Sequence, residues 1–163
     1  VCDKCAAGKY QANEGEQACV ACEQGSFCPA GASAALPCAA GTHSNKTDLG
    51  SASDCTPTVP GYHAPTGSTD PTPCSVGTVQ PLNKQPTCSK CNAGKFMNET
   101  GQTECHLCVP GSYCAEGASA PMPCSEGSYS GAIDLSSAGQ CTTTDAGYYA
   151  STGSTEQTKC SPG

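Results

Sequence analysis

Residues 2–10 read CDKCAAGKY, and this stretch decides the fold because its parts return throughout the chain. Two cysteines stand three positions apart, and a glycine and an aromatic residue follow the second one at fixed offsets. A cysteine pair with this spacing can bind zinc, carry out redox chemistry, or send its two sulfurs to different disulfide partners. The rest of the sequence has to distinguish these three interpretations.

Cysteine dominates the composition, with 16 of the 163 residues. Leu, Ile, Val and Phe together number only 14, and Trp is absent, so the chain cannot build one large apolar core. This density of cysteine is typical of a disulfide scaffold made in an oxidising compartment. In such scaffolds cross-links restrict the unfolded chain where the burial of apolar surface is too weak to favour folding. The composition therefore predicts an extracellular or cell-surface protein.

The charge balance argues against two classes of partner. Seven Lys and Arg residues against 14 Asp and Glu residues give a net charge of −7, which disfavours binding to nucleic acid or to an anionic membrane through a basic patch. No apolar run approaches the roughly 20 residues of a membrane span, so we expect no direct membrane insertion of this segment. The sequence begins with Val and shows no signal peptide, and we expect it to be a piece of a longer chain whose targeting sequence lies elsewhere.

The chain is nearly two copies of one 86-residue unit. Every cysteine of the second half stands 86 residues after one of the first half, and aligning residues 1–77 with 87–163 gives 38 identical positions of 77. We therefore expect one repeat at 1–86 and a second at 87–163, which ends nine residues short. The spacing of the cysteines is the same in both copies although about half of the aligned positions differ, which indicates that the fold requires a fixed geometry of its cross-links. The cysteines stand at 2, 5, 19, 22, 28, 38, 55 and 74, and at 88, 91, 105, 108, 114, 124, 141 and 160.

A shorter motif, Cys-x-x-Gly-x-aromatic, recurs inside the unit. A glycine just after a cysteine fits a turn with positive φ, and the aromatic residue two positions later can cover a neighbouring disulfide. No stretch has sustained helical periodicity, and 19 Gly and 13 Pro residues disfavour long helices. We expect a small disulfide-rich, mostly irregular fold of short β-ribbons with little or no helix, stacked as an elongated rod. The motif begins at Cys5, Cys22, Cys91, Cys108 and Cys124, with degenerate forms at Cys38, Cys74 and Cys160.

This motif, the C-x-x-C that follows it, and the run G-x-[FY]-C-x-x-G-x6-C at residues 25–38 and 111–124 resemble ephrin-receptor-like cysteine-rich repeats. Those repeats are related in pattern to the cysteine-rich modules of tumour-necrosis-factor receptors. The resemblance covers essentially the whole chain. Long arrays of such repeats occur in surface proteins of algae and other protists, including the mastigoneme proteins of flagellar hairs. The resemblance implies an extracellular rod or stalk whose partners are further copies of the repeat, in the same chain or in neighbouring chains.

The receptor modules also imply a disulfide pairing for this chain. The implied pairs are Cys5–Cys19, Cys22–Cys38, Cys28–Cys55, Cys74–Cys88, Cys91–Cys105, Cys108–Cys124 and Cys114–Cys141. The loops between Cys5 and Cys19 and between Cys74 and Cys88 would each stabilise the fold by about 3 kcal/mol on the chain-entropy model. By equivalence between the copies, Cys2 and Cys160 would pair outside this segment. The sequence alone leaves the connectivity open.

Zinc binding is a competing interpretation of the cysteines. The spacing C-x2-C-x13-C-x2-C at Cys2, Cys5, Cys19 and Cys22 is close to that of four-thiolate zinc sites. Four further cysteines per unit with equally fixed spacing favour disulfides, so we expect no metal and no cofactor apart from covalent glycans. No βαβ pattern surrounds any C-x-x-C, which disfavours a thioredoxin-type redox role.

Catalytic residues are not indicated by the repeat. The three histidines, His43, His63 and His106, have no histidine at the equivalent position of the other copy, so a repeated histidine-based site is excluded. We therefore expect no enzymatic activity.

Two aspartates, Asp48 and Asp134, stand at equivalent positions. A calcium site that includes Asp48 and Asp54 is conceivable, but Asp54 becomes Gln140 in the second copy. We interpret the matched pair instead as turn residues that precede the apolar contacts of Leu49 and Leu135.

Glycosylation signals occur on both copies. Asn45 and Asn98 lie in sequons for N-glycosylation, at positions that are not equivalent. The stretches 56–73 and 142–159 are rich in Thr and Ser, a composition that suits O-glycosylation of a solvated loop. The O-glycosylation candidates are Thr56, Thr58, Thr66, Ser68, Thr69, Thr72, Thr142, Thr143, Thr152, Ser154 and Thr155.

Together these features predict a segment of an extracellular glycoprotein that serves as a rod, stalk or filament subunit and has no catalytic activity. The alternative is a ligand-binding receptor ectodomain. It would carry an exposed aromatic or charged patch in one copy that the other lacks. Tyr129 and Tyr149, which replace His43 and His63 in the second copy, are the sequence feature that favours it.

Overall fold

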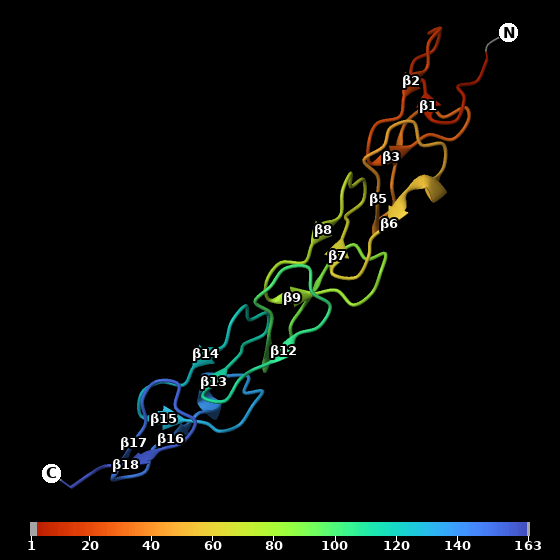
Figure 1. Ribbon diagram of the computed structural model, residues 1–163. Helices are drawn as coiled ribbons and strands as arrows, with labels where there is room; N and C mark the ends of the chain where they lie inside the picture. The colour runs from red at the N-terminus through yellow and green to blue at the C-terminus, as the bar shows by residue number, and fades with distance from the viewer. Residues whose placement is uncertain (1–2, 163) are drawn as a thin grey trace. The chain divides into compact units, whose positions relative to one another are not determined.

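The computed structural model describes residues 3–162 and forms nine two-stranded antiparallel ribbons from them (Figure 1). Each strand is two residues long, and the helical elements of the described residues are two short 3₁₀ turns, η1 (Ala52–Asp54) and η2 (Ala138–Gln140). The fold is thus the small, disulfide-rich, mostly irregular one with short β-ribbons that the sequence predicts.

Each ribbon pairs two strands that are close in the sequence. The pairs are β1 (Lys9–Tyr10) with β2 (Val20–Ala21), β3 (Ser26–Phe27) with β4 (Leu36–Pro37), β5 (Thr42–His43) with β6 (Thr56–Pro57), β7 (Tyr62–His63) with β8 (Thr72–Pro73), β9 (Thr78–Val79) with β10 (Ser89–Lys90), β11 (Lys95–Phe96) with β12 (His106–Leu107), β13 (Ser112–Tyr113) with β14 (Met122–Pro123), β15 (Ser128–Tyr129) with β16 (Thr142–Thr143), and β17 (Tyr148–Tyr149) with β18 (Thr158–Lys159).

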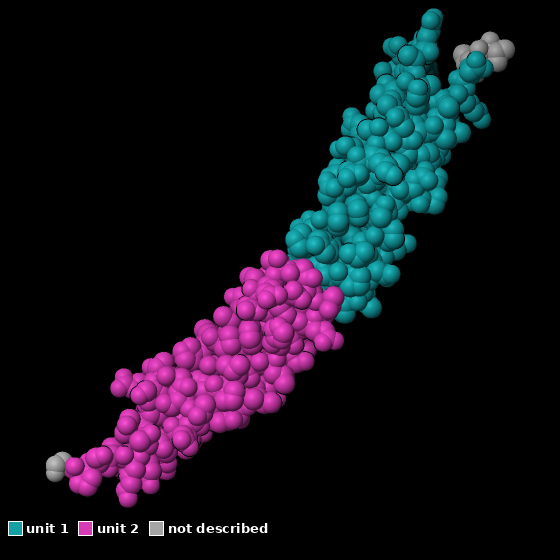
Figure 2. All heavy atoms as spheres, viewed as in Figure 1, with its two compact units in different colours: residues 1–74, 80–88 teal, residues 75–79, 89–163 magenta. Residues whose placement is uncertain are grey.

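The ribbons belong to two compact units (Figure 2). Unit 1 consists of the residues up to Cys74 together with Gln80–Cys88, and unit 2 consists of Ser75–Val79 together with the residues from Ser89 onward. The boundary therefore differs from the expected division between residues 86 and 87. The physical reason is that the Cys74–Cys88 disulfide holds the loop Gln80–Cys88 in unit 1, whereas β9 pairs with β10 in unit 2.

A glycine precedes the first strand of every ribbon and takes part in backbone hydrogen bonds. Its carbonyl accepts a hydrogen bond from the residue that follows the second strand, as from Cys22 N–H to Gly8 O at 2.9 Å, which closes the ribbon. In the first eight ribbons the glycine N–H also donates to the carbonyl of the residue that follows the first strand of the next ribbon, as from Gly8 to Cys28 O at 2.8 Å. The turn glycines are Gly8, Gly25, Gly41, Gly61, Gly77, Gly94, Gly111, Gly127 and Gly147, and all nine have positive φ.

Gly41 shows why this position requires glycine. Its φ of 83° lies in the left-handed region, which side chains other than glycine rarely adopt. A Cβ at this position would also overlap the carbonyl group of Lys84, which packs directly against the glycine. A Cβ would overlap a backbone carbonyl in the same way at Gly8, Gly25, Gly77, Gly94 and Gly111. The turn glycine at these positions therefore both turns the chain and packs against a second backbone segment.

The carbonyls that pack on these glycines come from a second set of residues with positive φ. Asp48 presents its carbonyl to Gly8 and donates its N–H to Cys22 O at 3.0 Å, and Lys84 donates likewise to Thr58 O at 2.8 Å. Asp134 repeats in unit 2 what Asp48 does in unit 1, with φ values of 63° and 62°. This confirms the interpretation of the matched aspartates as turn residues, because Asp tolerates the left-handed conformation better than most residues.

The apolar core of each unit is small and built around cystine sulfur. In unit 1 Leu49 packs with Cys38 and Cys55, and in unit 2 Val79 packs with Cys91 and Met97. Leu49 and Leu135 are both buried, as expected for the residues that follow the turn aspartates. Backbone hydrogen bonds and disulfides therefore position the chain, and apolar burial only fills the space between them.

The first prediction concerns Gly41 and its equivalent Gly127, which have φ values of 83° and 79°. No atom lies within 4 Å of a Cβ built on Gly127, whereas one on Gly41 meets Lys84. Gly127→Ala should cost about 1–2 kcal/mol from the backbone conformation alone. Gly41→Ala should cost a further 1–3 kcal/mol or so from overlap.

Amide hydrogen exchange measures both costs locally. Thr58 N–H binds Gly41 O, and Thr144 N–H binds Gly127 O, so each amide reports on its own glycine. Protection of Thr58 in the Gly41→Ala variant should fall further than protection of Thr144 in the Gly127→Ala variant. Equal losses would contradict the role assigned to the carbonyl contact.

Candidate functional site

The disulfides are the chemical feature that both units share. Three pairs in unit 1 have an equivalent 86 residues later in unit 2, and a seventh, Cys74–Cys88, closes the loop at the end of unit 1. The seven are Cys5–Cys19, Cys22–Cys28, Cys38–Cys55, Cys74–Cys88, Cys91–Cys105, Cys108–Cys114 and Cys124–Cys141. The three loops of 14-residue separation are those that the receptor resemblance implied.

The interleaved pairs implied by that resemblance are wrong. Cys22 does not pair with Cys38, nor Cys28 with Cys55, and the same holds for Cys108–Cys124 and Cys114–Cys141. The reason is the turn glycine. Gly25, with φ of 73°, folds the chain back so that Cys22 and Cys28 meet across a separation of six residues, and Gly111 does the same in unit 2.

Cys160 of unit 2 differs from its equivalent in unit 1. Cys160 has an exposed thiol with no disulfide partner among the described residues, whereas its equivalent Cys74 is paired with Cys88. The expected pairing of Cys2 falls outside the described residues. A pairing of Cys160 beyond this segment stays a prediction.

In three ribbons the side chain two positions after the turn glycine contacts the disulfide of the cysteine that closes the same ribbon. Phe27 packs on the cluster that contains Cys38 and Cys55. Val79 packs beside Cys91, whose partner Cys105 lies against the same cluster. Both examples agree with the expectation that this position covers a neighbouring disulfide.

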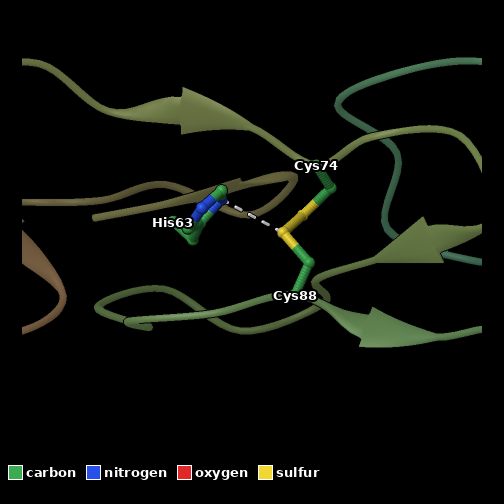
Figure 3. A group of neighbouring side chains, drawn as sticks. All are labelled: His63, Cys74 and Cys88. Atoms are coloured by element: carbon green, nitrogen blue, oxygen red, sulfur yellow. Dashed lines mark hydrogen bonds between the residues drawn. A yellow bond between two sulfur atoms is a disulfide. The ribbon is translucent and has the colours of Figure 1, made fainter. Parts of the chain in front are cut away.

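His63 occupies the covering position of the ribbon that Cys74 closes, and it adds a polar contact. Its Nδ1 atom lies 3.3 Å from Sγ of Cys88 (Figure 3). Cys74 is buried, and Cys88 and His63 are half-buried. Gly61 is the turn glycine of this ribbon, and counting two positions from it, as in the regular motifs, gives His63 rather than Tyr62.

His63, Cys74 and Cys88 form a cluster whose nitrogen and sulfur atoms all lie within 4.8 Å of one another. The two sulfurs are joined in a disulfide, so neither offers the thiolate that a metal would need. The candidate zinc ligands Cys5, Cys19 and Cys22 are likewise used in disulfides, with Cys19 and Cys22 bonded to different partners. This excludes the four-thiolate interpretation in this structure.

The other two histidines lie apart from such a cluster. His43 is half-buried in β5, where it pairs with Thr56 of β6. His106 packs against Phe96 with the ring centroids 5.7 Å apart and the ring planes tilted by 51°.

Asp54 has a structural partner that explains its replacement by Gln140. Its Oδ2 accepts hydrogen bonds from the N–H groups of Gly50 and Ser51, at 3.0 and 2.9 Å, at the start of η1. Oε1 of Gln140 accepts from Ser136 and Ser137 at the start of η2. Either side chain satisfies the free N–H groups before a helical turn, which favours a capping role over calcium binding.

The expected N-glycosylation sites are accessible. Asn45 and Asn98 are both exposed, and the Asn45 side chain donates only a 3.3 Å hydrogen bond to Asp70. Neither side chain would have to leave a packed environment to accept a glycan.

Most of the O-glycosylation candidates are accessible as well, but Thr58 is not. It is 1% exposed, and its hydroxyl accepts the N–H of Gln85 at 3.1 Å. Thr58 and Thr144 replace the ribbon-closing cysteine of the other ribbons, because each donates its N–H to the turn glycine. Ser68 and Ser154 are half-buried, and the exposed candidates are Thr56, Thr66, Thr69, Thr72, Thr142, Thr143, Thr152 and Thr155.

Comparisons with known proteins leave the family open. A scan against models of known protein families found no match, and a search of curated proteins found none either. The disulfides themselves indicate the compartment. Bonding of this extent is characteristic of extracellular or secreted proteins, and the chain is of that kind.

A separate observation concerns membranes. Within residues 3–162, no helix reaches the length and apolar character that crossing a bilayer requires.

The second prediction tests the capping role of Asp54. Asp54→Gln, which copies unit 2, should leave stability nearly unchanged. Asp54→Ala should cost about 1 kcal/mol because the N–H groups of Gly50 and Ser51 lose their acceptor. Exchange of those two amides with and without added calcium is the measurement. A calcium-dependent rise in protection that Asp54→Gln abolishes would contradict this assignment.

Proposed function

We propose that the chain is a structural segment of an extracellular rod, stalk or filament, built from a repeated unit and without catalytic activity. The observation that carries the proposal is the repetition of one framework. Gly8, Gly25 and Gly41 of unit 1 and their equivalents in unit 2 make the same backbone hydrogen bonds, and three disulfides of unit 1 recur 86 residues later in unit 2.

The framework is made largely of backbone atoms, which leaves the side chains free to change. In unit 1 the N–H groups of Gly8, Gly25 and Gly41 each bind the carbonyl that follows the next first strand, at 2.7–2.8 Å. Each ribbon contacts the next ribbon through its glycine N–H and the ribbon after that through a packed carbonyl, as Gly8 contacts Asp48. Repeat proteins whose contacts are short-range in this way can be extended by adding units, so further copies of the repeat are the partners that fit.

The surface properties are compatible with exposure over the whole length of such a repeat. The net charge of −7 disfavours collapse of copies onto one another. Exposed sequons at Asn45 and Asn98, and the exposed threonines of the two loops, provide places for glycans. The finer assignment, a glycoprotein fibre of the ephrin-receptor-like or mastigoneme type, rests on the resemblance of the cysteine–glycine motifs.

One observation favours a ligand-binding receptor segment as the second candidate. Tyr129 and Tyr149 stand in the second copy where the first has His43 and His63. Tyrosine is among the residues enriched at binding hot spots.

The third prediction compares chains with two, three and four complete 86-residue units, secreted from a eukaryotic host and measured by small-angle X-ray scattering. A structural rod should gain a constant increment in maximum dimension with each unit. A compact protein would instead grow with roughly the 0.38 power of chain length in radius of gyration. Such compact growth would overturn the proposal.

A matched control separates the framework from the tyrosines. Changing Tyr148→Ser and Tyr149→Ser together should leave the increment per unit unchanged, because neither side chain takes part in the repeated hydrogen bonds. Replacing Gly41 and the equivalent glycine of every added unit by alanine should instead change the gain in maximum dimension per unit, because these substitutions disrupt the backbone contacts.

A further inference from the structure

We propose that the Cys74–Cys88 disulfide is a thiol-exchange site, at which a small monothiol becomes attached to Cys88 with the help of His63. The proposal starts from the 3.3 Å contact between His63 Nδ1 and Cys88 Sγ (Figure 3). It is independent of the structural role proposed for the chain.

A second disulfide in the same chain provides a matched comparison. Cys91–Cys105 has the same sequence separation of 14 residues and nearly the same Cα–Cα distance, 5.8 Å against 5.7 Å for Cys74–Cys88. In both pairs the first cysteine is buried and the second is half-buried. The difference lies in the covering residue, which is Val79 for one pair and His63 for the other.

His63 supplies what thiol–disulfide exchange requires. The attacking species is a thiolate, so a base beside the attacked sulfur raises the rate at which a neutral thiol reacts. Cys88 is the half-buried cysteine of the pair whereas Cys74 is fully buried, and the imidazole nitrogen lies next to the Cys88 sulfur. Val79 can offer no such group to Cys105.

The exchange step balances without any further oxidant or reductant. The monothiol gives its proton to neutral His63, and its sulfur bonds to Cys88 Sγ while the Cys74–Cys88 bond breaks. Cys74 leaves as a thiolate and takes the proton back from His63, because both sulfurs lie within 4.8 Å of the ring nitrogen. The products are a mixed disulfide on Cys88 and a thiol on Cys74, and attack by Cys74 on the mixed disulfide reverses the reaction.

Hydrogen bonds hold the loop in place when the disulfide opens. Nε2 of Gln80 donates to Thr87 O at 2.8 Å, and Oε1 of Gln80 accepts from Leu82 N–H at 3.1 Å. Lys84 and Ala64 add backbone hydrogen bonds that tie the loop to the preceding ribbons. The two cysteines therefore stay close to His63, and the exchange is reversible without unfolding the unit.

The fourth prediction is tested on the full chain after its free thiols have been blocked by alkylation. The chain is exposed to 2-mercaptoethanol at neutral pH, quenched at intervals with a second alkylating reagent, and analysed by peptide mass spectrometry. Cys74–Cys88 should open about tenfold or more faster than Cys91–Cys105. The first product should carry mercaptoethanol on Cys88 and the alkyl group on Cys74.

The His63→Phe variant isolates the role of the imidazole, because Phe27 already serves as the covering residue elsewhere in the chain. In this variant the rate at Cys74–Cys88 should fall to that of Cys91–Cys105. Equal rates at the two disulfides of the unaltered chain would overturn the proposal, and this comparison does not depend on the variant folding. A fast rate that persists in His63→Phe, or mercaptoethanol attached first to Cys74, would overturn it as well.

Discussion

The contact between a turn glycine and a backbone carbonyl, made at six of the nine turn glycines, is the constraint on which the remaining structure depends. At Gly8 and Gly41 the missing Cβ leaves room for the carbonyl of Asp48 or Lys84, and the positive φ directs the glycine N–H toward the next ribbon. A chain with so few large apolar residues cannot obtain this order from burial. The order of this chain comes from backbone hydrogen bonds, and the disulfides add stability by restricting the unfolded state.

The disulfides follow from this arrangement. Because Gly25 reverses the chain between Cys22 and Cys28, these two cysteines meet locally, and Cys38 is left to pair with Cys55. The residue two positions after the glycine then lies over the disulfide that closes its ribbon. Where that residue is Phe27 or Val79 the disulfide has an apolar cover, and where it is His63 the cover carries a nitrogen. One position of the motif can therefore serve packing in one ribbon and chemistry in another.

Much of this fold was predictable from the sequence, and the reason is the motif. The 86-residue period, the short ribbons, the positive φ of the glycine after each cysteine, and the turn role of Asp48 and Asp134 all follow from residue type and spacing. The pairing of Cys22 with Cys28 did not follow, since spacing alone does not decide between a local loop and a crossing pair. The burial of Thr58 was also missed, because its position as a substitute for a ribbon-closing cysteine appears only once the hydrogen bonds are known.

The most direct test of this account is the disulfide map of the unreduced protein. Digestion after Glu23, Phe27 and Ala35 separates Cys22, Cys28 and Cys38 onto different peptides, and cleavage after Tyr113 and Glu116 does the same for Cys108, Cys114 and Cys124. The account predicts that mass spectrometry will find Cys22 linked to Cys28 and Cys38 linked to Cys55, with the equivalent pairs in unit 2. Peptides that link Cys22 to Cys38 or Cys28 to Cys55 would contradict it.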